Sequence, residues 1–329
     1  MMYDSGPDAD DLRRIRIDVR AAHERLCGQV RHTPLLPSRW LSQAAGRPIL
    51  LKAENLQETG SFKARGALNF LLGLSPSERE RSVVTASAGN HGQALAWAAN
   101  RLGIRATVVL PLDAVNVKVE RTASWGPLVM VVRHGHGYDE AHAYAERLAG
   151  ETGAIYASAY DHPDVMAGQG TLALEILADE PDIAGIVVPV GGGGLIVGVA
   201  AAMADVPPRP WVLGVQSDRT SALHDALRAG RLTLVEYLPT LADGLAGETC
   251  QHALDLCRAL GVAVDLTPEE TLLPAIRETL LREHLAIEGS AATAVAAVLQ
   301  GLLPPGDGPV ALVLSGGNVA PEVLAQALT

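Results

Sequence analysis

Residues 54–67 read E-N-L-Q-E-T-G-S-F-K-A-R-G-A and join a predicted strand to a predicted helix. An apolar run of strand length precedes this stretch, and residues 64–74 place leucines along one side of a helix. Lys63 lies just inside the expected helix start, where Thr59 and Ser61 are the candidate caps. The positive potential at a helix start, together with desolvation, lowers the pKa of a lysine and makes its amine a usable nucleophile. Most lysines are solvated surface residues, however, and this stretch alone favours that interpretation.

The composition indicates a soluble globular protein with one large domain or two closely packed ones. The chain has 329 residues, of which 48% are hydrophobic and 19% are charged. Its net charge of -11 argues against binding to the phosphate backbone of nucleic acids. Its three cysteines are too few and too irregularly spaced for a disulfide framework or a zinc site. No apolar run is long enough to span a membrane and the acidic N-terminal residues do not resemble a signal peptide, so we expect a cytoplasmic protein.

The middle of the chain alternates predicted strands with predicted helices. Strands are expected at residues 83–86, 106–110, 128–132, 154–157, 185–190, 211–215 and 310–314, and helices at residues 90–102, 115–125, 138–150, 165–177 and 195–203. This alternation predicts an α/β fold whose parallel-rich sheets are covered by helices on both faces. We place domain boundaries near residues 81 and 157, so that a small domain of residues 82–157 is inserted into a large domain formed by residues 1–81 and 158–329.

One strand-to-helix loop consists of Gly191, Gly192, Gly193 and Gly194. Successive glycines bring backbone N–H groups close to a ligand, and at a helix start they form a cradle suited to a phosphate. A dinucleotide fingerprint is the competing interpretation, but Ile196 or Val197 stands where its final glycine is needed. The next strand also ends at Gln216, where an acidic residue would hold the ribose of NAD. A purely structural loop is a further alternative, although four glycines carry a cost in backbone entropy.

Three more strand or helix ends carry polar groups. Residues 87–92, S-A-G-N-H-G, offer backbone N–H groups, a hydroxyl and an amide to a small carboxylate, although a lone histidine such as His91 is more often structural. The hydroxyl of Ser315, after the last predicted strand, can hydrogen-bond a neutral ring nitrogen without protonating it. Glu288 precedes a helix of small residues, where an ordinary helix-start carboxylate is the favoured interpretation.

Together these residues make the chain resemble the fold-type II pyridoxal-phosphate enzymes, and within them the serine/threonine dehydratase and serine racemase group. The matching motifs lie in family order over about residues 30 to 320. They are T-P-L (33–35), T-G-S-F-K-A-R-G-A (59–67), S-A-G-N-H-G-Q-A (87–94), A-G-Q-G-T-L-A-L-E (167–175), P-V-G-G-G-G-L (189–195), L-A-D-G-L (241–245) and S-G-G-N (315–318). The resemblance implies a two-domain architecture like that of the tryptophan synthase β chain, and pyridoxal 5′-phosphate as the cofactor.

The resemblance also implies a role for each matching residue. Lys63 matches the lysine that binds the cofactor covalently, and Phe62 would pack against the cofactor ring. Asn90 matches the partner of the 3′-oxygen of the cofactor, and Ser315 matches the partner of its pyridine nitrogen. The residues expected to bind the cofactor are Phe62, Lys63, Asn90, Gly191, Gly192, Gly193, Gly194, Glu288 and Ser315. Those expected near the substrate carboxylate are Ser87, Gly89, Asn90 and His91.

The reaction implied is a β-elimination that converts a β-hydroxy amino acid such as L-threonine or L-serine into a 2-oxo acid and ammonia. Lys63 would remove the Cα proton, and Ser315 would leave the ring nitrogen unprotonated. Other β-hydroxy amino acids stay open as substrates, among them 3-hydroxyaspartate, phenylserine and compounds from ectoine breakdown. Racemisation or β-replacement is less favoured, because Ala88 stands where the racemases of this group carry a second serine.

Two further expectations concern partners. A non-catalytic ligand-binding protein on the same fold is an alternative class, but the intact Lys63 argues against it. Some relatives bind a divalent cation, and their glutamate and aspartate positions fall on Gln216 and near Ala222 in this chain. The nearby Asp218 and Asp225 do not restore that spacing, so we expect no metal site. Since dimers are usual in the family, we expect a homodimer.

Overall fold

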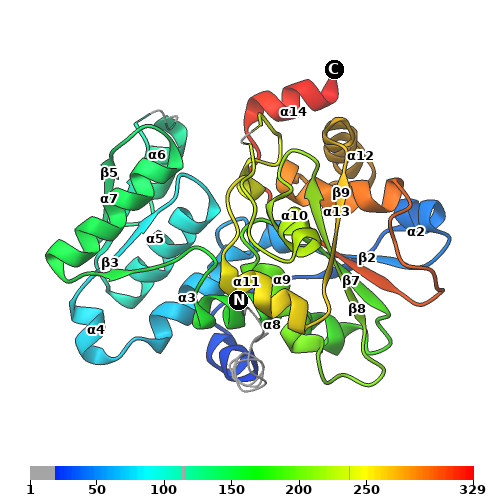
Figure 1. Cartoon of the computed structure of the whole chain (residues 1–329), viewed down its shortest axis with the longest axis horizontal. Coiled ribbons are helices and arrows are strands. Elements are labelled where there is room, and N and C mark those ends of the chain that lie inside the picture. Colours follow the sequence, from blue (N-terminus) through cyan, green and yellow to red (C-terminus); the bar gives the residue numbers. More distant parts are fainter. Residues whose placement is uncertain (1–18, 113, 115, 237) are drawn as a thin grey trace.

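The computed structural model describes residues 19–112, 114, 116–236 and 238–329. Within these residues the strands form two sheets, one of six strands and one of four (Figure 1). Helices cover both sheets, so the predicted α/β class with parallel-rich sheets is confirmed. Within the same residues, no helix is long and apolar enough to cross a membrane.

The larger sheet is formed by the first two strands and the last four strands of the described chain. Its spatial order is β1 (Leu35–Pro37), β2 (Ile49–Lys52), β10 (Val310–Val313), β7 (Gly185–Pro189), β8 (Trp211–Ser217) and β9 (Ala263–Thr267). β1 pairs antiparallel with β2, and the remaining pairs are parallel. Every residue of β7 and β10 is buried, as expected for strands with helices on both faces.

Alternate side chains of β7 enter two apolar cores. Ile186 and Val188 pack with the helices of one face, and Val187 packs with those of the other face. The first face is covered by α8 (Pro163–Asp179), α9 (Gly194–Met203), α10 (Ala222–Ala229) and α11 (Gln251–Ala259). The second is covered by α2 (Arg39–Ala45), α12 (Leu272–Glu283), α13 (Gly289–Leu299) and α14 (Pro321–Leu328).

The smaller sheet has the order β5 (Val129–Arg133), β4 (Ala106–Leu110), β3 (Val83–Ala86) and β6 (Ile155–Tyr156), and all its pairs are parallel. The helices around it are α3 (Lys63–Gly73), α4 (Pro76–Glu80), α5 (Asn90–Leu102), α6 (Asn116–Ala123) and α7 (Gly137–Thr152). Helix α3 lies outside residues 82–157, yet Ala64, Ala67 and Leu68 share an apolar core with β3 and α5. The domain boundaries near residues 81 and 157 therefore stay a prediction.

The strands and helices predicted between residues 82 and 203, and the strands at 211–215 and 310–314, are present with ends within two residues of the predicted ones. The predicted caps of α3 are wrong. Its N-cap is Phe62, and no side chain in the described part of the chain caps it. Ser61 instead forms a β-bridge with Gly316, and this pairing holds the chain extended just before the helix.

Two close crossings fix α8 between α3 and α9. At the first crossing, a Cβ on Gly168 would lie 2.7 Å from the Cα of Gly66 on α3. At the second, a Cβ on Gly198 of α9 would lie 2.2 Å from the carbonyl oxygen of Met166 and 2.7 Å from the amide of Gly170. Glycine at these positions lets the helix backbones touch. The helix that carries Lys63 and the helix that begins at the glycine loop are thus held by one shared partner.

Candidate active site

A cavity of about 400 Å³ is enclosed by loops from both sheets. The loops that follow β3, β7 and β10 all contribute, as expected for a ligand site at the carboxyl ends of parallel strands. The structure brings together all the residues that we expected in the site. Phe62, Lys63, Ser87, Gly89, Asn90, His91, Gly191, Gly192, Gly193, Gly194, Glu288 and Ser315 line this cavity. Their individual roles stay predictions.

Lys63 is the first residue of α3, and its side chain reaches the cavity half-buried. Its Nζ donates a hydrogen bond to the carbonyl oxygen of Ala159 at 2.9 Å and lies 5.2 Å from the centre of the Phe62 ring. Burial lowers the pKa of the Lys63 ammonium from 10.5 to about 8, although the charge of Glu288 acts in the opposite direction. A usable fraction of this amine is therefore unprotonated near neutral pH.

Glu288 is a buried carboxyl group at the back of the cavity, with a relative exposure of 7%. It is the N-cap residue of α13, as the helix-start interpretation required, but within the described residues its side chain makes no cap hydrogen bond. Instead its Oε1 accepts a hydrogen bond from Asn90 Nδ2 at 2.7 Å. Burial, together with the charge of Asp243, raises the pKa of Glu288 to about 7, and the Asn90 hydrogen bond opposes this shift.

A chain of amides connects Glu288 to the loop after β10. Asn90 Oδ1 accepts a hydrogen bond from Asn318 Nδ2 at 2.7 Å, and the same nitrogen donates to the carbonyl oxygen of Thr59 at 2.9 Å. Side chains from α13 and α5 and from the S-G-G-N loop are thereby held in one arrangement. Asn318 is not among the predicted site residues, although it is the last residue of the S-G-G-N motif.

The glycine loop lies against Tyr160. A Cβ on Gly192 would lie 2.7 Å from the Tyr160 ring, and a Cβ on Gly194 would lie 2.7 Å from the Tyr160 carbonyl oxygen. Gly193 has a φ of 103°, in the left-handed region that favours glycine. The loop therefore requires glycine for close approach, and it leads directly into the N-terminus of α9, where backbone N–H groups suit a phosphate.

Ser315 follows β10 and is buried at the cavity wall. Its carbonyl oxygen accepts a hydrogen bond from the Phe62 amide at 3.1 Å, so the serine is fixed relative to the start of α3. This places a neutral hydroxyl group, and not a carboxylate, in the position expected to face the cofactor ring.

His91 is a neutral residue in this site. Its buried ring places Nε2 3.2 Å from the carbonyl oxygen of Ala157, which can only accept. Burial, together with the charge of Lys63, lowers the pKa of His91 to about 3. Nδ1 then carries a lone pair, and it has no partner among the described residues. A cationic contact between His91 and a substrate carboxylate is therefore not available. The donors in this loop are backbone N–H groups, the Ser87 hydroxyl and the Asn90 amide, which already donates to Glu288.

The cavity fits pyridoxal 5′-phosphate. It combines a glycine cradle, an amine of lowered pKa and a neutral hydroxyl. The Ser290 hydroxyl is also buried against the cavity with no hydrogen-bond partner in the described residues. Residues that would hold the phosphate, the reactive carbon and the ring are thus present in one space.

Gln216, where some relatives carry a cation-binding glutamate, makes its hydrogen bonds within the protein. Gln216 is fully buried, its Nε2 donates to the carbonyl oxygen of Thr220, and its Oε1 accepts from the amide of His224 at 2.9 Å. Across the described chain, no group of three or more His, Cys, Asp or Glu residues could hold a metal ion. Both polar atoms of the Gln216 side chain thus have protein partners, and the absence of a metal site stays a prediction.

The wall of the cavity contributed by the smaller sheet was not predicted. Lys118 of α6 lies 3.4 Å from a carboxylate oxygen of Asp243, and Arg121 donates to Asn318 Oδ1 at 3.3 Å. Tyr138 and His142 of α7 also line this side. These residues belong to none of the glycine-rich motifs, so their place in the cavity could not be predicted from local sequence.

The class of protein follows from this geometry and from comparison with known proteins. A lysine with a lowered pKa, a phosphate cradle and a neutral ring partner in one cavity are typical of an enzyme that uses pyridoxal phosphate. Residues 26–316 match the family model described as "Pyridoxal-phosphate dependent enzyme". The chain belongs to this family.

Individual relatives narrow the group. The chain is 43% identical over 303 residues to the L-threonine ammonia-lyase of Thermotoga maritima. The aligned region covers 92% of this chain and 75% of the relative. The structure of the present chain is similar to that of the processed threonine deaminase isoform 2 from Solanum lycopersicum, with a TM-score of 0.91 and 30% sequence identity. The match covers 98% of this chain and 94% of the other chain. Maize serine racemase gives a TM-score of 0.89, 29% identity and coverage of 95% and 96%. The predicted fold-type II architecture and pyridoxal phosphate cofactor are confirmed.

Proposed function

We propose that this protein is an ammonia-lyase that dehydrates and deaminates L-threonine or L-serine, giving a 2-oxo acid and ammonia. The observation that carries the proposal is the position of the Lys63 amine in the cavity, where burial lowers its pKa to about 8. Relatives named L-threonine ammonia-lyase and threonine deaminase support the choice of substrate.

Each group in the cavity has a task in this reaction. When bound, pyridoxal phosphate withdraws electrons from the amino acid and so stabilises negative charge at its Cα. The N–H groups of the glycine loop hold the phosphate, and Lys63, unprotonated, takes the Cα proton as a general base. Ser315 brings no charge to the ring, which favours prompt loss of the β-hydroxyl group over slower side reactions. Asn90, held by Glu288 and Asn318, orients the ring.

Ala88 favours elimination over racemisation. Its methyl group lines the cavity at the position where the racemases of this group carry a serine. A methyl group can neither give nor take a proton, so proton transfer is confined to the face served by Lys63.

We also propose a homodimer, as is usual in the family, and a cytoplasmic location, which suits the three unpaired cysteines.

The sequence makes the test of Lys63 unusually clear, because its three lysines are Lys52, Lys63 and Lys118. Lys52 is buried in an ion pair with Glu175, and Lys118 is partly exposed. Borohydride reduction of the holoenzyme, followed by peptide mass spectrometry, should place the cofactor on the peptide that contains Lys63. Ketoacid release should be measured with L-threonine, L-serine and a panel of bulkier or acidic β-hydroxy amino acids.

Lys63→Ala should lose ketoacid release from L-threonine and L-serine, and Arg105→Ala, at an exposed residue of another loop, is the control that should keep it. Full activity in Lys63→Ala, or cofactor attached to Lys118, would show that the proposal is wrong. If the protein turned over a bulkier amino acid but neither L-threonine nor L-serine, the proposed reaction type would stand and the proposed substrate would be wrong.

A further inference from the structure

We propose that Glu269 is a positioning residue that fixes one wall of the active-site cavity from outside the cavity. It lies in the 3₁₀ turn η3 (Glu269–Thr271), two residues beyond the end of β9. The wall is the 3₁₀ turn η2 (Asp243–Leu245), whose residues all line the cavity. Glu269 itself is not among the lining residues.

The Glu269 carboxylate is buried, with a relative exposure of 7%, and donors from two separate segments converge on it. Its Oε1 accepts a hydrogen bond from the backbone amide of Leu241 at 2.5 Å. Its Oε2 accepts from the hydroxyl of Thr240 at 2.8 Å and from the hydroxyl of Ser217. A carboxylate has no proton to give, so it is suited to a position where every neighbour donates.

These hydrogen bonds continue into the wall. The Thr240 hydroxyl, while it donates to Glu269, accepts a hydrogen bond from the amide of Ala242 at 2.9 Å. The carbonyl oxygen of Ala242 then accepts from the amide of Leu245 at 2.8 Å and so closes the turn. The position of Glu269 is thus transmitted through consecutive hydrogen bonds to the residues that face the ligand.

Glu269 is also connected to the edge of the larger sheet, at the ends of β8 and β9. β8 and β9 are neighbouring parallel strands, and Ser217 is paired in register with Thr267. The Glu269 amide donates to Asp218 Oδ1 at 3.0 Å, and the Ser217 amide donates to the Thr220 hydroxyl at 3.1 Å. The carboxylate therefore connects a rigid sheet edge to the cavity wall.

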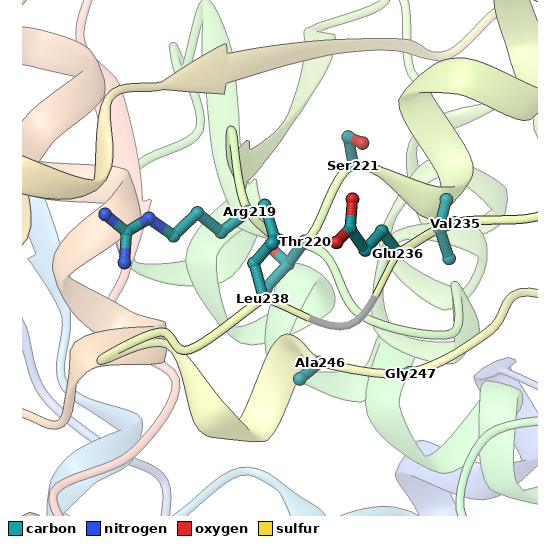
Figure 2. Close-up of a pocket in the computed structure, with 8 residues that line it drawn as sticks. All are labelled: Arg219, Thr220, Ser221, Val235, Glu236, Leu238, Ala246 and Gly247. Atoms are coloured by element: carbon teal, nitrogen blue, oxygen red, sulfur yellow. The ribbon is translucent and has the colours of Figure 1, made fainter.

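The far end of the wall, Ala246 and Gly247, lies between two spaces. A second, water-sized hollow of about 10 Å³ lies behind it. Figure 2 shows Thr220, Glu236 and Leu238 on one side of this hollow and Ala246 and Gly247 on the other. Ala246 and Gly247 also line the active-site cavity, so this part of the wall is a single layer of backbone between two spaces. Ala242 and Leu245 pack in the second apolar core, and the hydrogen bonds at residues 240 and 241 connect the wall to Glu269.

The wall also contacts the helix that begins beside Glu288. A Cβ on Gly289 would lie 2.0 Å from the carbonyl oxygen of Leu241, and a Cβ on Gly244 would lie 2.7 Å from Ser290 Oγ. A shift of the wall would therefore change the space in front of α13. Substrate binding, which rests on the proposed function, should respond to Glu269 while attachment of the cofactor at Lys63 does not.

The test compares Glu269→Ala with Glu269→Gln in the holoenzyme. Glutamine keeps an oxygen for the Leu241 amide, and its NH₂ group can donate to the hydroxyls of Ser217 and Thr240 once these rotate. In Glu269→Ala, KM for the amino acid should rise about 10-fold, and amide exchange in the peptide of residues 240–246 should accelerate about 10-fold. The absorbance of the bound cofactor should be unchanged. Glu269→Gln should stay within about 3-fold of wild type in both measurements.

Glu270→Ala is the matched control, because Glu270 is the exposed neighbour in the same turn. If Glu269→Ala does not fold, Thr240→Val removes the hydroxyl while keeping the carboxylate, and should accelerate exchange in the same peptide. Unchanged exchange in a folded Glu269→Ala or Thr240→Val would overturn the proposal, as would an equal change in Glu270→Ala. Amide exchange needs no turnover, so a wild type that releases no ketoacid would refute only the proposed function.

Discussion

The replacement Lys52→Met tests whether a buried group of charges holds the helix that carries Lys63 in place. The group consists of Lys52 on β2, Glu54 just after it, Arg65 on α3 and Glu175 on α8, and it has no net formal charge. Arg65 Nη1 and Nη2 donate to the two oxygens of Glu175 at 2.6 and 2.8 Å. Its Nε and Nη2 donate to Glu54 at 2.9 and 2.8 Å. Arg65 lies two residues after Lys63, so these bonds fix the first turn of α3.

The expected cost can be worked out from the contacts of Lys52. Its fully buried Nζ donates to Glu175 Oε2 and to the carbonyl oxygen of Thr33, both at 2.7 Å. Methionine is similar in length but leaves the group with one uncompensated negative charge and Thr33 without this donor. Breaking a buried ion pair costs about 3–5 kcal/mol of unfolding free energy, and we expect a loss in that range.

The assay is equilibrium urea unfolding of the holoenzyme, followed by tryptophan fluorescence and by the cofactor spectrum, with Glu175→Gln and the double variant beside it. The double variant leaves Glu54 and Arg65 as a neutral pair, so it should be less destabilised than the sum of the single variants. Burial acts to raise the pKa of Glu175, but its bonds with Arg65 and Lys52 outweigh this effect and lower the pKa. Its stabilising effect is therefore present above the unfolded-state pKa and lost as the pH falls through the folded-state value. A loss below about 1 kcal/mol for Lys52→Met, as for an exposed pair, would refute the reasoning.

Three further outcomes follow from the site and the helix crossings. Since the folded-state pKa of Glu288 is raised from 4.5 to about 7, its effect favours the folded state below pH 4.5 and is lost as the pH rises to about 7. Glu288→Gln should therefore gain about 3 kcal/mol of unfolding free energy relative to wild type between pH 4.5 and 8, and parallel pH profiles of the two proteins would contradict this. Apoprotein should reload pyridoxal phosphate faster as the pH rises through about 8, where Lys63 loses its proton, and a flat rate from pH 6.5 to 9 would argue against the lowered pKa. Gly170→Ala should lower the unfolding free energy by about 1–3 kcal/mol, because its Cβ would lie 2.5 Å from the Gly198 carbonyl oxygen. The control Gly150→Ala, whose Cβ would meet nothing within 4 Å, should not destabilise the protein.

The parts of the fold that the sequence predicted are those with a local signal. β7 and β10 are continuous apolar runs that are each followed by a glycine-rich loop, so their positions could be predicted within two residues. β9 escaped prediction because it is an edge strand with the mixed sequence A-V-D-L-T, in which Val264 and Thr267 are buried and Ala263 is exposed. The caps of α3 were predicted from residue type alone, and the long-range bridge between Ser61 and Gly316 made that prediction wrong.

The same distinction holds for the site. The predicted residues lie in motifs that place a functional group at the end of a strand or the start of a helix, as Lys63 and Ser315 do. Tyr160, which supports the glycine loop, and Asn318, which holds Asn90, act through contacts between distant segments. Such contacts depend on how the two sheets and their loops come together, so the S-G-G-N motif alone did not indicate the role of Asn318, and Tyr160 lies in none of the motifs.

The glycine crossings of α8 have a consequence for how this enzyme can change over evolutionary time. The residues expected to bind the cofactor phosphate and to attach the cofactor belong to helices α9 and α3, which α8 joins into one body. The side of the cavity formed by Lys118, Arg121, Tyr138 and His142 belongs to other helices, which those crossings do not include. We expect mutations there to change substrate choice more than they change cofactor attachment. The helices expected to hold the cofactor are thus structurally separate from the side of the cavity where we expect substrate preference to evolve.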